Sequence, residues 1–279
     1  DVYGMARLHQ NAQVYIDAGL SSSRASFALE DEARATKPSA LDYVKVEELF
    51  VKLDRLPYNL YVRAGRLAPT YGWRIPDHTS FVRRDLGFGE TRSWFGVEAG
   101  INPNYPYANV AVFYQGVEGW PGDTNPPGVG VSASAGVREL GWQVGGSVHY
   151  LSILAGGRDL AVGPQWAVNL APVVYLGELD FRTQLDGDGV RTTSLYAYHE
   201  LQWLATRGLA VKLKYDWEDP SMLYVDDHLN RITLGADVSP YTFVEVEPQY
   251  RRTWRGGGAF ASGGEQVGNE VLFMVHGWY

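Results

Sequence analysis

The final nine residues, Val271–Tyr279, read VLFMVHGWY. Side chains of an extended strand alternate between two faces. One face of this segment carries Val271, Phe273, Val275, Gly277 and Tyr279. That face is apolar and the segment ends on an aromatic residue. The pattern fits an ordinary core strand, and it also fits a strand whose apolar face meets lipid.

The composition narrows the class of protein. The chain has 279 residues, 13% of them aromatic, with 18 Tyr, 9 Trp and 32 Gly. All-β barrels of this size are routinely single domains, so we expect residues 1–279 to form one domain. The absence of cysteine excludes disulfides, thiolate metal sites and CxxCH haem attachment, and no cofactor is expected. A net charge of −8 without a basic run argues against nucleic-acid binding.

Alternating hydrophobicity recurs along the whole chain. In 209–217, Leu209, Val211 and Leu213 share one face, whereas Lys212 and Lys214 lie on the other. This pattern predicts an all-β fold, a transmembrane antiparallel up-and-down β-barrel of about fourteen strands. The segment 41–53 changes phase near Glu47–Glu48. The fourteen segments are 11–20, 41–53, 58–66, 92–102, 106–116, 129–138, 141–151, 164–171, 173–183, 191–203, 208–217, 227–238, 241–252 and 269–279.

The connections between these segments alternate between long and short. Residues 67–91 form the longest connection, and 152–163 is another predicted long one, whereas 239–240 is a tight turn. Short periplasmic turns and longer external loops produce this alternation in outer-membrane barrels, but a soluble β-sandwich has no reason to keep it. Three short turns carry a Pro-Tyr pair whose Tyr is expected at the membrane interface, namely Tyr58, Tyr107 and Tyr241.

No stretch reads as a transmembrane helix, because the uncharged segment 160–177 is interrupted by two prolines. The chain begins at Asp1 without an apolar leader. We therefore expect a mature chain, its signal peptide removed, in the outer membrane of a Gram-negative bacterium.

The face opposite the apolar one would line a lumen, and it carries charges of both signs. Two interpretations stay open: a water-filled pore with a transverse field, and a closed lumen cross-linked by ion pairs. Long loops tend to be functional. Three placements stay open for the segment 65–90: a constriction inside the barrel, a surface for a partner, or an external cap. Arg63, Arg66, Arg83 and Arg84 form the predicted basic constriction. All candidate pore residues are Arg63, Arg66, Arg74, Arg83, Arg84, Lys212, Lys214, Arg231, Glu245, Glu247 and Arg251.

Enzymatic and metal sites are not predicted. The runs 226–228 (Asp-Asp-His) and 77–80 (Asp-His-Thr-Ser) pair acids or hydroxyls with histidine, but adjacent residues on a strand point to opposite faces. The DGDG run at 186–189 is too short to complete a calcium shell and reads as a turn.

Two segments resemble a known family. The closing LFMVHGWY (272–279) resembles the last strand of bacterial outer-membrane barrels, which the barrel-assembly machinery reads. Together with YVRAGRLAPTYGWRIPDHTSFVRRDLGF (61–88), it resembles porin-like outer-membrane proteins of deltaproteobacteria and related groups, some of which sheath or partner multihaem cytochromes. The resemblance implies an outer-membrane barrel surrounded by lipids and lipopolysaccharide.

These observations favour a porin-like channel that passes small hydrophilic solutes or ions. The alternative is a scaffold barrel without free conductance that holds a lipoprotein or a multihaem cytochrome. A surface-exposed outer-membrane hydrolase is a minor alternative.

Overall fold

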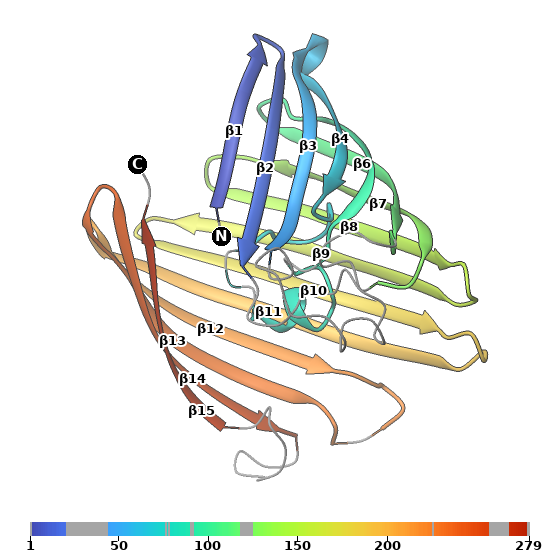
Figure 1. Cartoon of the computed structure of the whole chain (residues 1–279). Helices are drawn as coiled ribbons and strands as arrows, with labels where there is room; N and C mark the ends of the chain where they lie inside the picture. Colours follow the sequence, from blue (N-terminus) through green and yellow to red (C-terminus); the bar gives the residue numbers. More distant parts are fainter. Residues whose placement is uncertain are drawn as a thin grey trace, which may run out of the picture.

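The computed structural model describes residues 2–20, 44–75, 77, 79–89, 92–117, 125–224, 226–256 and 268–277. In these ranges the chain forms one antiparallel sheet of fifteen strands, each paired with its neighbours in sequence (Figure 1). The strands are β1 (Val2–His9), β2 (Ala12–Leu20), β3 (Val44–Leu56), β4 (Leu60–Leu67), β5 (Trp94–Ile101), β6 (Pro106–Gln115), β7 (Gly128–Arg138), β8 (Trp142–Ile153), β9 (Arg158–Leu170), β10 (Val173–Leu185), β11 (Arg191–Thr206), β12 (Leu209–Asp219), β13 (Leu229–Tyr241), β14 (Val244–Arg255) and β15 (Gly268–Gly277).

The up-and-down antiparallel architecture of about fourteen strands is confirmed, and the described residues form fifteen. The fourteen predicted segments correspond to β2–β15, and β1 is the additional strand. Its sequence hides it, because its inward face, which pairs with Tyr15 and Asp17 of β2, carries Met5 and Tyr3 instead of polar side chains, and its outward face carries the small residues Gly4 and Ala6. With an odd number of strands, β1 and β15 run in the same direction. Within the described ranges the ladder begins at β1 and ends at β15, and no pairing joins these two edges.

Short and long connections lie at opposite ends of the sheet. At the short-connection end, the strands are joined by 10–11, 57–59, 102–105, 139–141, 171–172, 207–208 and 242–243. One prediction for the other end was wrong: 152–163 is not a long loop. Strand β9 begins at Arg158, so the turn is only Leu154–Gly157. The early part of β9 escaped prediction because Ala161 and Gly163, on its inward face, are not polar.

The predicted faces of the strands are separated as expected. Leu213 is 48% exposed on the outer face, whereas its neighbour Lys214 is 3% exposed. The phase change at Glu47–Glu48 is a β-bulge, since Asp17 pairs with Glu48 and the next residue, Ala18, pairs with Val46. Among the described residues, no helix combines the length and apolarity needed to cross a bilayer.

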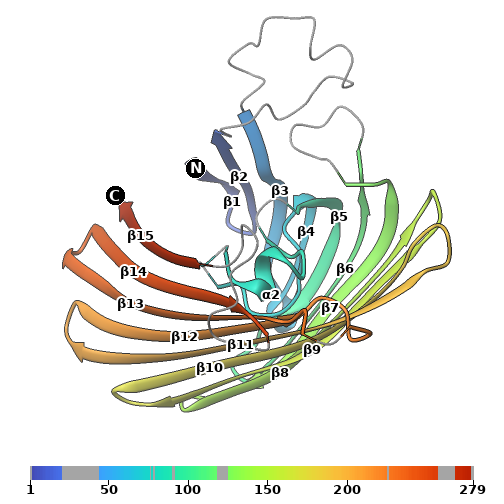
Figure 2. The same cartoon turned by 90° about the horizontal axis from the view of Figure 1, so that it is seen from below.

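The apolar core lies inside the curved sheet rather than between two layers. Figure 2 shows α2 (Phe81–Arg84) within the arc formed by the strands. Buried rings from the β4–β5 connection, including Tyr71, Phe81 and Phe88, pack against inward residues such as His149 and Tyr198. The connection between β4 and β5 therefore fills part of the interior.

Candidate functional site

The segment 68–93 between β4 and β5, here called the inserted loop, crosses the concave face of the sheet. At its start, the Thr70 carbonyl accepts a hydrogen bond of 2.7 Å from Ser132 Oγ of β7. Further along, the Phe81 amide donates to Asp216 Oδ1 of β12 at 3.1 Å. The contacts with the wall therefore extend well beyond the neighbouring strands. Of the three placements predicted for this segment, the structure shows the one inside the sheet.

Asp77 is the most heavily paired residue of the inserted loop. Its Oδ2 lies 3.0 Å from Lys214 Nζ of β12 and 3.0 Å from Arg251 Nη2 of β14. Burial by itself raises the pKa of the Asp77 carboxyl, but the charges of Lys214 and Arg251 and the hydrogen bond from Thr79 outweigh it and hold this pKa well below its ordinary value. Asp77 therefore stays ionised and ties the loop to two strands.

Other wall cations hold the backbone of the same segment. Arg231 Nη1 of β13 donates to the Thr79 carbonyl at 2.7 Å, and its guanidinium lies 4.2 Å from the centre of the Phe81 ring. Arg182 of β10 pairs with Asp159 and also donates to the Asp85 carbonyl at 3.4 Å. Three predicted pore cations, Lys214, Arg231 and Arg251, therefore hold the loop in place.

A second set of contacts fixes the part of the loop nearest the short-connection end. Tyr71 Oη donates to Asp180 Oδ1 at 2.8 Å, and the Trp73 amide donates to Glu178 Oε2 at 2.9 Å. Gly72 lies between them at φ +59°, and its amide donates to Ser147 Oγ at 3.0 Å. A Cβ on Gly72 would collide with the Glu178 carboxylate, so only glycine allows this close approach.

The apolar part of the loop fills the long-connection half of the interior. Phe81 and Leu86 are fully buried, and Phe88 stacks on Tyr71 with ring centres 4.1 Å apart. His149 of β8 stacks on Trp94 at 4.9 Å in the same cluster. This packing supplies the hydrophobic burial that a loop needs to remain inside a polar lumen.

A cavity of about 410 Å³ remains on the other side of the loop, toward the short-connection end. It lies between the inserted loop and the inward faces of β3 to β9. Cations at its wall are Lys52, Arg63, Arg74 and Arg138. The lining carboxylate, Glu98, accepts hydrogen bonds from Arg63 Nε and Nη2 at 2.8 and 2.7 Å.

The predicted basic constriction divides between two regions. Arg63 lines the cavity, whereas Arg66 on the same strand is 1% exposed and lies against the Phe95 ring. Arg83 and Arg84 belong to α2, which contacts β11 and β12. Arg83 is buried, and Arg84 is half-exposed and paired with Asp85 at 2.8 Å. Their joint role as a constriction stays a prediction. Arg74, the fifth arginine of the candidate set, lines the cavity and lies 3.7 Å from Glu48.

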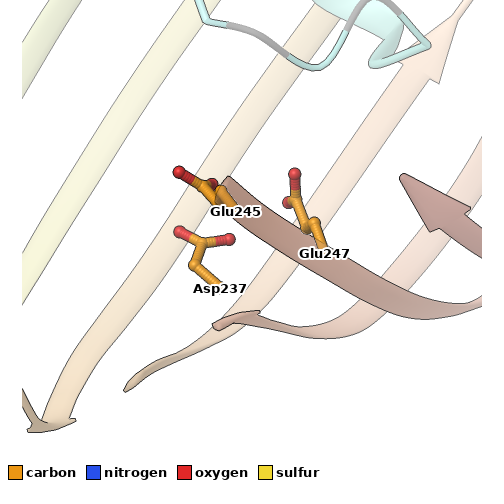
Figure 3. A group of neighbouring side chains, drawn as sticks. All are labelled: Asp237, Glu245 and Glu247. Carbon is orange, nitrogen blue, oxygen red and sulfur yellow. The ribbon is translucent and has the colours of Figure 1, made fainter. Parts of the chain in front are cut away.

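The predicted acids Glu245 and Glu247 lie on another part of the wall, near the short-connection end of β14. Figure 3 shows their carboxylates beside that of Asp237 from β13, and oxygens of the three lie within 4.8 Å of one another. The Lys212 ammonium contacts Asp237 Oδ1 at 2.6 Å and Glu247 Oε1 at 3.2 Å. A side-chain cation therefore already neutralises part of this acidic group.

Sequence reasoning missed several cavity residues. The Tyr107 side chain was expected at the membrane interface, but it lines the cavity and accepts hydrogen bonds from Gln143 and Gln165. The alternation along β6 marks the correct face: Tyr107 lies on the same side of the strand as Asn109 and Ala111, and Ala111 is buried. Tyr58 and Tyr241, in contrast, are 88% and 65% exposed.

The remaining predicted segments are placed as follows. Val271, Phe273 and Val275 are exposed on one face of β15, and Gly277 ends that strand, whereas Tyr279 lies outside the described residues. His78 also lies outside them. The His228 ring lies 6.2 Å from that of Trp217, and Asp186 caps its own turn through bonds from the Asp188 and Val190 amides.

Comparisons with known proteins support the fold. No protein-family model matches the chain, and no curated protein sequence matches it. Solved structures do. OmpT of Vibrio cholerae aligns with a TM-score of 0.69 at 8% identity, over 99% of this chain and 88% of the other. Salmonella typhi OmpF gives 0.68 at 10% identity, and an anion-selective porin from Comamonas acidovorans 0.63 at 11% identity, both with the same coverage. The fold of this chain is therefore that of outer-membrane β-barrel porins.

Proposed function

We propose that the chain is a porin-like channel of the Gram-negative outer membrane, which passes small hydrophilic solutes or ions through a charged interior. The observation that carries this proposal is a lumen-facing cavity of about 410 Å³, lined by charged and amide side chains, inside a sheet whose outer face is apolar. An apolar outer face suits lipid, and a polar interior suits water and solutes.

The distribution of charge supports the same function. Near the short-connection end, β3 and β7 contribute the cations Lys52 and Arg138, whereas β13 and β14 contribute three carboxylates, Asp237, Glu245 and Glu247, which exceed the charge of the Lys212 ammonium beside them. Cations and acids on separate parts of one wall produce a field across the lumen, and rings of charge set ion selectivity in channels.

Partners of this proposed channel follow from its location. Its outer face would contact outer-membrane lipids and lipopolysaccharide, and β15 would be read by the barrel-assembly machinery. No enzymatic activity belongs to this proposal.

A scaffold barrel without free conductance is the second candidate. The apolar cluster around Phe81, Phe88 and His149 favours it, because this packing fills the long-connection half of the interior. Such a barrel would hold a lipoprotein or a multihaem cytochrome, and the partner would carry any covalently attached haem, since this chain has no cysteine for a CxxCH motif.

Single-channel recording separates the two candidates. The purified chain, shown to be folded by its resistance to heat in detergent, is reconstituted into a planar bilayer with a salt gradient. Stable conductance steps with a non-zero reversal potential are expected for the channel. Silence from the folded protein would contradict the channel and favour the scaffold.

A further inference from the structure

We propose that the cavity beneath the inserted loop binds small hydroxylated carboxylates, with sugar acids as the best fit. The inference deepens the proposed function, since it names a solute class for the channel. The volume of the cavity, about 410 Å³, lies in the range of small-molecule sites.

The cavity carries an excess of positive charge. Lys52 Nζ lies 5.1 Å above the Tyr61 ring, and no carboxylate of the described residues is paired with it. The Arg74 side chain is 50% exposed, and its Nη2 is 3.7 Å from Glu48 Oε2. Arg138 hydrogen-bonds to Asn102, an uncharged partner. These cations keep most of their charge available to an anionic solute.

The carboxylate that lines the cavity, Glu98, is already neutralised. Glu98 receives two hydrogen bonds from Arg63, one of 2.8 Å from Tyr61 Oη and another from Thr70 Oγ1. A carboxylate with that many donors has little capacity left to attract a cationic solute. The cavity therefore prefers anions.

Hydroxyl and amide groups of the cavity wall supply uncharged hydrogen-bonding positions. Tyr107 Oη accepts from Gln143 Nε2 at 3.3 Å and from Gln165 Nε2 at 3.0 Å, so its own proton is left to donate. Gln165 is 3% exposed, so its amide supports Tyr107 from within the wall. Gln143 is only partly buried and lines the cavity, so its amide offers a donor and an acceptor to a bound hydroxyl.

These groups together define the chemistry of the ligand. Lys52, Arg74 and Tyr107 offer donors to a carboxylate, and the Gln143 amide offers an acceptor to a hydroxyl. The flat rings of Tyr61 and Trp73, which also line the cavity, suit the apolar face of a sugar ring. A molecule with one carboxylate, several hydroxyls and a compact ring satisfies all of them.

Calorimetry on the detergent-solubilised full chain tests the site without any need for conductance. The probes are glucuronate, glucose, which lacks the charge, and acetate, which lacks the hydroxyls. Glucuronate should bind about tenfold more tightly than either of the others. Equal affinity for glucuronate and acetate would overturn the sugar-acid assignment, and absence of glucuronate binding would overturn the site.

Two variants and a matched control locate the binding. Lys52→Met should weaken glucuronate and acetate together, whereas Gln143→Leu should weaken glucuronate and leave acetate unchanged. Arg207→Met removes an exposed cation from the same end of the molecule, in the turn after β11, and should change neither affinity. Unchanged glucuronate binding in a folded Lys52→Met variant would place the ligand elsewhere and overturn the proposal.

Glucuronate binding and single-channel conductance test the sugar-acid site and the channel separately. Conductance without glucuronate binding would leave the porin-like function standing and remove the sugar-acid site. Binding without conductance would support the site and contradict the channel, because the cavity would then belong to a closed barrel.

Discussion

Asp77 of the inserted loop and Lys214 of β12 form a buried ion pair of 3.0 Å, although 137 residues separate them in sequence. Arg251 of β14 joins the same carboxylate. The inserted loop joins β4 to β5, and β12 and β14 lie far from these two strands in the order of the sheet. The ion pair therefore holds the loop across the interior. Its loss is therefore the most direct way to release the loop.

Asp77→Asn should detach the inserted loop. The change leaves Lys214 and Arg251 buried without their counter-charge, a cost on the order of 3–5 kcal/mol. Limited trypsin digestion measures the outcome, since release would speed cleavage after Arg83 and Arg84 on α2. The matched control is Asp85→Asn on the same loop, whose exposed pair with Arg84 is worth about 0–1 kcal/mol. Equal cleavage of the two variants would contradict the anchoring role of Asp77.

Acid should release the loop only at low pH. A carboxyl whose pKa is depressed in the folded state stabilises that state above its ordinary pKa, and the stabilisation is lost as pH falls toward the depressed value. The loop should therefore stay attached from pH 8 down to about pH 4, the region of an unperturbed aspartate. Near-ultraviolet circular dichroism reports the packing of the loop's aromatic rings. A transition well above that pH, or an identical transition in Asp77→Asn, would show that another group controls it.

Leu213→Arg should destabilise the barrel, because Leu213 points away from the lumen on β12 and would face lipid. Arginine at such a position costs about 2–4 kcal/mol near the bilayer midplane. Urea unfolding in lipid vesicles measures this change. Leu223→Arg, in the exposed connection between β12 and β13, is the control and should be nearly neutral. Unaltered stability of Leu213→Arg would argue against the assignment of the lipid face.

The sequence predicted what depends on local periodicity and missed what depends on distant pairing. Alternation was enough to place Leu213 outward and Lys214 inward, and even the bulge at Glu47 left a visible change of phase. Strand β1 was missed because neither face carries the usual pattern: Tyr3 and Met5 lie on the inward face, and small residues lie on the outward one.

The candidate site was less predictable than the fold for a physical reason. The charges of the inserted loop were visible, but their partners were not, since Asp77 meets Lys214 only after the loop folds back into the sheet. Tyr107 shows the same limit at shorter range. Its Pro-Tyr turn suggested a position at the membrane interface, but the successive pairing of strands β6, β7, β8 and β9 brings it to Gln143 and Gln165.

Gly72→Ala should displace the inserted loop from β10. Alanine would be strained at φ +59°, by about 1–2 kcal/mol, and its Cβ would also collide with the Glu178 carboxylate. Gly189→Ala separates the two effects, because Gly189 has a similar φ of +84° but no atom within 4 Å of the added Cβ. Both variants should lose stability in urea unfolding, and only Gly72→Ala should change conductance and the exposure of Trp73 to a fluorescence quencher. If the two variants behaved alike, backbone strain alone would explain the glycine, and close contact between the loop and Glu178 would not control the interior.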